Sequence, residues 1–83
     1  MKINNNLKII NEIVSECIKK EISINIWPRQ FDTSIIIKSE NEKLYLESLL
    51  PWKYEYIQDI HLTSPENLLN EIKKFSNLSN RKL

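Results

Sequence analysis

The side chains that could carry out acid–base or metal chemistry lie close to the single histidine of the chain, in the stretch "EYIQDIH" at 55–61. In a β-strand, Glu55, Asp59 and His61 would share one face, because alternate residues point the same way. An imidazole beside two carboxylates could bind a metal ion or transfer protons. We expect ordinary surface side chains instead, because this is a poor ligand set for zinc and an open sheet face has no pocket that would shift a pKa.

The only cysteine, Cys17, is the other residue with chemical potential. It recurs with Leu7, Ile10 and Val14 at spacings of three and four residues, which places it on the apolar face of a helix. A catalytic thiol needs an exposed, electropositive setting, so we expect Cys17 to be packed in the core. A single cysteine cannot form an internal disulfide, which favours a reduced, cytoplasmic setting.

Glycine is absent from all 83 residues. Phosphate-binding loops, dinucleotide fingerprints and nucleophile elbows need glycine where the backbone approaches a ligand or turns sharply, so these motifs are excluded. The sequence therefore predicts a protein that is not an enzyme and uses no cofactor.

The composition, with 41% hydrophobic and 28% charged residues, is that of a globular domain. The apolar run Ile35–Ile37 is far shorter than the roughly 18 residues that would span a bilayer, so we expect no membrane segment. Asn11 and Glu12 interrupt the apolar residues near the start of the chain, so we also expect no secretory signal.

The net charge of +1 gives little electrostatic attraction to nucleic acid. The basic pairs at 19–20, 73–74 and 81–82 could still form a phosphate-binding patch, so a small nucleic-acid-binding regulator stays open as an alternative.

Hydrophobic periodicity and capping signals predict six elements in the order α-β-β-α-β-α. These are a helix at 4–20, strands at 22–27 and 34–38, a helix at 40–50, a strand at 53–62 and a helix at 65–76. The fourth element is ambiguous. Ser39 and Glu42 form a capping box before helix-forming residues, which favours a helix, whereas "KLYLES" alternates as a strand would.

The fold class is therefore α+β. We expect one domain over 1–83 with a frayed tail at 77–83, built on a small mixed sheet of three strands, or four if 40–50 is a strand. Three strands are few, so the helices should cover one face only. Ile22, Ile24 and Ile26 would face the helices.

The outer face of this sheet is the candidate site. It would carry Trp27, Ile36 and Ile57, which are costly to leave in water, next to polar residues such as Glu55. Such a face is typical of a protein interface, unless another helix or the 28–33 loop with Phe31 covers it. The sheet edges are also open to strand addition by a partner, and a homodimer is possible.

The stretch "SIIIKSENEKLYLESLL" resembles one group of small phage-encoded anti-CRISPR proteins. The matching residues are Ile3, Asn4 and Asn5 at the start of the chain and Ser39–Glu42, within the first 50 residues. The resemblance implies an inhibitor that occupies the surface of a host defence ribonucleoprotein in the host cytoplasm, without chemistry. It also implies a second contact patch formed by the acids Glu40, Glu42 and Glu47.

This chain departs from that group in charge, because those inhibitors look like acidic mimics of nucleic acid. Here only the segment 39–65 is acidic, with two basic and five acidic residues giving −3. We therefore expect a small protein-binding module with Trp27, Ile36, Ile57 and Glu55 as its main contacts. The last alternative is a small metal protein or metal-dependent enzyme that uses His61.

Overall fold

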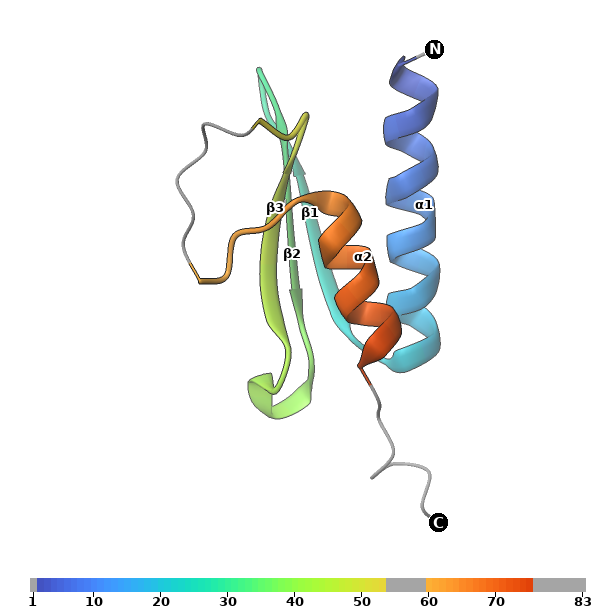
Figure 1. Cartoon of the computed structure of the whole chain (residues 1–83), viewed down its shortest axis with the longest axis vertical. Coiled ribbons are helices and arrows are strands. Elements are labelled where there is room, and N and C mark those ends of the chain that lie inside the picture. Colours follow the sequence, from blue (N-terminus) through green and yellow to red (C-terminus); the bar gives the residue numbers. More distant parts are fainter. Residues whose placement is uncertain (1, 54–59, 76–83) are drawn as a thin grey trace.

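The computed structural model describes residues 2–53 and 60–75, with side chains from Leu7 onward. Figure 1 shows two helices on one side of a three-stranded sheet, which confirms the α+β class. The elements are helix α1 (Lys2–Lys20), strands β1 (Ser23–Pro28), β2 (Thr33–Lys38) and β3 (Tyr45–Leu50), the 3-10 turn η1 (Glu40–Glu42) and helix α2 (Pro65–Lys74).

The sheet has the order β1-β2-β3, and both strand pairs are antiparallel. Ile24 pairs with Ile37 and Ile26 with Ile35, so the alternating isoleucines of β1 and β2 share one face, as the sequence predicts. α1 packs against β1 and α2 against β3, so both helices lie on that face. One core joins the two helices and the sheet; its buried members are Ile13, Cys17, Ile22, Ile35, Ile37, Leu50, Leu68, Leu69 and Ile72.

The predicted helix at 40–50 is wrong. Only one 3-10 turn forms there, Asn41 leaves it at a φ of 65°, and residues 45–50 are the third strand. The Oγ of Ser39 accepts a hydrogen bond from the backbone N–H of Leu44, at 2.8 Å, so it closes a β-hairpin instead of capping a helix. The alternation of the sequence outweighs helix propensity, because pairing with β2 buries Ser48 and Leu50 on the core face.

The predicted strand at 53–62 falls mostly on 54–59, which lie outside the described residues, as does the predicted tail at 77–83. Its described end forms a single parallel bridge between Leu62 and Glu47. There the N–H of Glu47 donates to the carbonyl of His61 at 2.7 Å, and the N–H of Thr63 donates to the carbonyl of Glu47 at 2.9 Å. The mixed sheet that we expected is thus antiparallel in its three strands, with one parallel bridge at the β3 edge.

Hydrogen bonds cap the N-terminus of α2 and the C-terminus of α1. Ser64 caps α2 as predicted, since its Oγ accepts from the N–H of Asn67 at 3.2 Å and Pro65 follows it. α1 ends in a Schellman motif, in which the N–H of Ile22 donates to Cys17 O at 2.9 Å and the N–H of Glu21 to Ile18 O at 3.3 Å. Glu21 therefore has a φ of 59°, a left-handed conformation in which glycine is usual.

Lys20 connects the C-terminal ends of the two helices. Its Nζ donates to three carbonyl oxygens at the end of α2, those of Ile72 (2.8 Å), Lys73 (2.7 Å) and Phe75 (2.8 Å). The last carbonyls of a helix have no partner within it and carry partial negative charge, so an ammonium group stabilises them. The sequence places Lys20 correctly at the end of its own helix, but the carbonyls it binds belong to α2.

We predict that Lys20→Met lowers the free energy of unfolding by about 1–3 kcal/mol, because the carbonyls lose charge-assisted hydrogen bonds while most of the side-chain length is kept. Denaturant unfolding followed by circular dichroism measures this. The control is Lys19→Met, since Lys19 is exposed and, among the described residues, pairs only with Glu16, at 3.4 Å. Equal, small effects for the two variants would contradict the proposed role of Lys20.

Two buried serines should respond in opposite ways to removal of the hydroxyl group. Ser48 is fully buried, and its Oγ has no hydrogen-bond partner among the described residues, whereas the buried Ser39 accepts from Leu44. A buried hydroxyl without a partner costs about 1–3 kcal/mol. We expect Ser48→Ala to raise the thermal midpoint and Ser39→Ala to lower it, measured by scanning calorimetry. A loss of stability in Ser48→Ala would contradict this assignment.

Candidate functional site

The face of the sheet opposite the helices, which we name the outer face, is the candidate site. The strand register arranges its residues in three rows: Trp27–Ser34–Leu49, Asn25–Ile36–Glu47 and Ser23–Lys38–Tyr45. Both helices pack on the other face, so no described helix covers these rows.

Two aromatic side chains are exposed at the hairpin end of this face. Trp27 is 60% exposed at the end of β1, and Phe31 is 82% exposed in the loop that joins β1 to β2. Trp27 lies in the same row as Leu49, which is half-buried. The structure therefore leaves Trp27 in solvent, as the sequence predicts for an outward residue, and the loop with Phe31 does not bury it.

The loop that carries Phe31 is closed by one ion pair. The guanidinium of Arg29 donates to both carboxylate oxygens of Asp32, from Nε at 2.6 Å and from a terminal nitrogen at 2.9 Å. The backbone N–H of Arg29 also donates to the carbonyl of Asp32 at 2.7 Å. A bidentate pair has a fixed geometry, so it orders the loop and holds Phe31 at its tip.

The middle of the outer face combines an isoleucine with polar groups. Ile36 is half-buried between Asn25 and Glu47 in its row. The hydroxyl of Tyr45 donates to Oε2 of Glu47 at 2.6 Å, and the ring of His61 meets that of Tyr45 edge-on at 4.9 Å. Tyr45 and Glu47 therefore anchor the segment that follows residue 60 against the β3 edge.

The structure brings together three of the seven predicted contact residues: Trp27, Ile36 and Glu47. Glu55 and Ile57 lie outside the described residues. Sequence reasoning missed Tyr45 and Leu49 as outer-face residues because it placed them in a helix. Their alternation with Leu46, Ser48 and Leu50 is the signal that identifies them.

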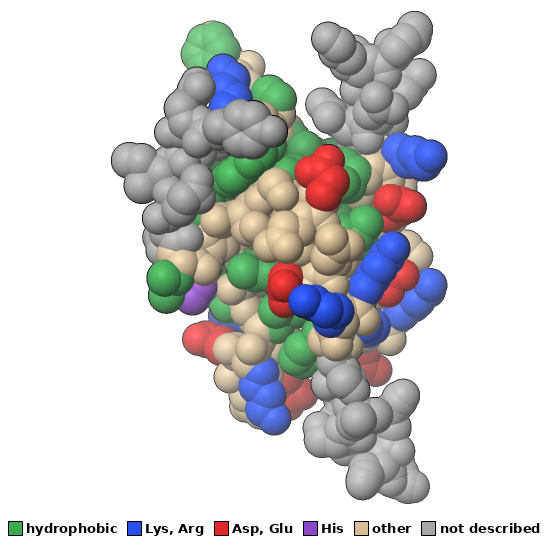
Figure 2. Space-filling model, in the orientation of Figure 1, with side chains coloured by type: hydrophobic (Ala, Val, Ile, Leu, Met, Phe, Trp, Pro, Cys, Tyr) green, Lys and Arg blue, Asp and Glu red, His purple; other side chains and the backbone are tan. Residues whose placement is uncertain are grey.

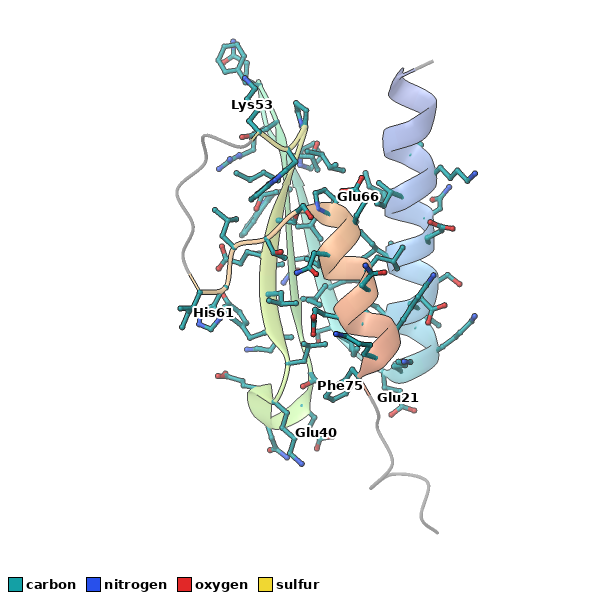
Figure 3. All side chains as sticks on the ribbon, viewed as in Figure 1. Glu21, Glu40, Lys53, His61, Glu66 and Phe75 are labelled. Atoms are coloured by element: carbon teal, nitrogen blue, oxygen red, sulfur yellow. The ribbon has the colours of Figure 1, made fainter. Side chains whose placement is uncertain are left out.

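Glu40 and Glu42 do not join the outer-face cluster at Trp27. They lie at the opposite end of the sheet, about 13 Å along β2 from the row of Trp27, as Figure 3 shows for Glu40. Glu42 pairs with Lys38 at 3.6 Å. Both acids line an open groove of about 490 Å³ with Glu21, Ser23, Lys38, Ser39 and Asn41. The predicted acidic patch is thus split, with only Glu47 on the outer face.

The chemically capable residues are placed as follows. Cys17 is buried as expected, and burial together with the nearby Glu16 raises the pKa of its thiol to about 11, so it is protonated at neutral pH. His61 packs on Tyr45 beside β3 (Figure 3), while Glu55 and Asp59 lie outside the described residues. Over 2–53 and 60–75, no group of three histidine, cysteine or acidic side chains could hold a metal ion.

Two further observations concern nucleic acid and membranes. Figure 2 shows lysine and acidic side chains mixed over α1 and α2, without separation by sign on this face. Within the described part of the chain, neither helix has the length and apolar character of a bilayer-spanning segment.

No protein family, curated protein or solved structure matches this chain. The likeness to anti-CRISPR proteins therefore stays an expectation drawn from the sequence stretch alone.

We predict that Asp32 titrates below its ordinary value, because the hydrogen bonds from Arg29, together with its positive charge, lower the pKa of this carboxyl. The pair therefore stabilises the loop at neutral pH and is lost as the pH falls through that lowered pKa. Arg29→Met should raise the pKa of Asp32, because it removes both the hydrogen bonds and the positive charge. NMR titration of the carboxyl carbons measures both values, with Lys19→Met as the control that leaves Asp32 unchanged.

Proposed function

We propose that this chain is a small protein-binding module that acts by occupying a partner's surface with its outer face. The observation that carries the proposal is the exposure of Trp27 on a sheet face that no described helix covers. Leaving a tryptophan in water is unfavourable by about 25 cal/mol for each Å² of apolar area, so its exposure favours a role in binding.

The surroundings of Trp27 have the composition of an interface centre. Phe31 adds a second exposed aromatic ring at the same end of the sheet, and Leu49 and Ile36 add partly exposed aliphatic area beside it. Ser34, Asn25 and Glu47 surround these residues with polar groups. Aromatic anchors within a polar rim are typical of the few residues that dominate binding energy in protein complexes.

The loop geometry also supports binding. The pair between Arg29 and Asp32 fixes the hairpin loop, so Phe31 loses less conformational freedom when a partner binds. Little reordering is then required of this end of the sheet. A surface that is ordered before binding suits an inhibitor that acts by steric occupation.

The resemblance of "SIIIKSENEKLYLESLL" to anti-CRISPR proteins gives the proposal its most specific form. In this form the partner is a protein subunit of a CRISPR ribonucleoprotein, and the chain blocks one of its surfaces. Glu47 would contribute a charged contact beside Ile36, while Glu40 and Glu42 would reach a separate part of the partner.

We predict that Trp27→Ala weakens partner binding by about 2 kcal/mol or more, roughly 30-fold. The specific form is tested in bacteria with active CRISPR immunity of several types, challenged by a targeted phage. Expression of the wild-type chain should restore plaque formation against at least one type, and Trp27→Ala should largely abolish this. The inhibited complex, once purified, then gives both affinities by calorimetry.

The control is Ile60→Ala, since Ile60 is 86% exposed and precedes His61, whose ring packs on Tyr45, two rows from Trp27. It removes exposed apolar area without changing the Trp27 row, so it should keep most of the activity. If Trp27→Ala folds and binds as the wild type does, Trp27 is not in the interface. If no CRISPR type is inhibited, the inhibitor form of the proposal is rejected.

A further inference from the structure

The free edge of β1 is the second unusual surface of this protein. β1 is an outer strand of the sheet, and no described strand pairs with its other edge. Edge strands in monomeric proteins usually carry charges, bulges or inward-pointing lysines that prevent pairing with other chains. The stretch "ISINIW" at 22–27 has no charged residue, and only Pro28 at its end limits pairing.

The hydrogen-bond pattern identifies which backbone groups face this edge. Arg29 donates its N–H to Asp32 across the hairpin, and Ser39 donates to Leu44 on the next one. Backbone N–H and C=O groups alternate in direction along a strand, so those of Asn25, four residues before Arg29, also point toward β2. Ile24 and Ile26 therefore direct their N–H and C=O groups to the open edge.

Helix α1 extends an apolar surface over the same edge. Leu7 is 53% exposed and Ile18 is 71% exposed, and with the half-buried Val14 they fall within roughly 40° of one another around the helix. Glu12 and Glu16, which line a groove with Lys73 of α2, lie about 140–180° from Leu7. The apolar stripe is thus on the flank of α1 that faces away from α2, beyond β1.

We propose that two copies of this chain pair through their β1 edges to form a six-stranded antiparallel sheet. A two-fold axis at Asn25 places Ile24 opposite Ile26 of the second copy, and the two pairs so formed use every outward N–H of Ile24 and Ile26 in four hydrogen bonds. No like charges meet within β1, and the register brings Glu21 toward Arg29 of the second copy at both ends.

The helix layer fits the same axis. Val14 lies about 9 Å from the C-terminal end of α1, measured along the helix axis. Asn25 lies about 10 Å from Ile22 along β1, so Val14 and Asn25 are at nearly the same position along the direction of the strand. The axis therefore brings the stripes of Leu7, Val14 and Ile18 together in antiparallel orientation. One symmetry operation buries both the apolar stripe and the open strand edge, which supports a second copy as the occupant.

A two-fold axis at Asn25 places the Asn25 side chains of the two copies opposite each other, so a charge introduced at this position meets the same charge in the second copy. Asn25 is exposed on the outer face, so Asn25→Lys and Asn25→Asp should leave the monomer folded. Sedimentation equilibrium from micromolar to near-millimolar concentration should show a wild-type dimer. Each variant alone should raise the dissociation constant by roughly fivefold or more, because like charges then lie directly opposite.

The mixture of Asn25→Lys with Asn25→Asp should recover association as a heterodimer. Asn70→Lys, on the exposed side of α2, is the control that should leave the dimer intact. Ile18→Lys tests the helix stripe independently and should also weaken the dimer. A monomeric wild type, a dimer unaffected by Asn25→Lys and Ile18→Lys, or a mixture that does not recover would each overturn the proposal. None of these outcomes affects the proposed role of Trp27, which is tested in a different assay.

Discussion

The structure depends on a sheet that has one face buried by two helices and one face without a described helix. α1 and α2 are held in one layer by the core and by the Lys20 ammonium, which donates to the last carbonyls of α2. Because both helices pack on the same face of the sheet, the alternating strand residues divide into a buried set and a set that contacts solvent or a partner. Ile35 and Ile37 belong to the first set, and Trp27 belongs to the second.

The elements that could be predicted are those whose local signals agree. α1 and α2 have apolar periodicity, α2 also has a clear N-cap in Ser64, β1 alternates, and β2 is a run of β-branched residues, so local preference and tertiary packing lead to the same result. The region 40–50 could not be assigned because its signals conflict. Its capping box and helix formers favour a helix, but pairing with β2 buries Leu50, and this pairing depends on contacts outside the segment.

The candidate site can be predicted from the sequence in β1 and β2 but not in β3. Alternation in β1 and β2 is enough to place Trp27 and Ile36 on the outer face. A helix at 40–50 would remove Tyr45 and Leu49 from it, and the sequence identifies Glu47 only as part of an acidic patch with Glu40 and Glu42. Its position in the row of Ile36 follows from strand register, which depends on contacts between residues far apart in sequence.

The outer face and the β1 edge are connected through β1 itself, whose residues take part in both. A two-fold axis at Asn25 continues the outer face of one sheet into that of the other, so the row of Trp27 meets Ser23 of the second copy. The two Trp27 side chains then lie on one six-stranded surface, on either side of the axis. A dimeric partner, or two sites on one assembly, could be bound at both positions, and linked binding events are tighter than single ones when the spacing fits. Dimerisation through β1 would therefore increase the avidity of the outer face without adding a contact to it.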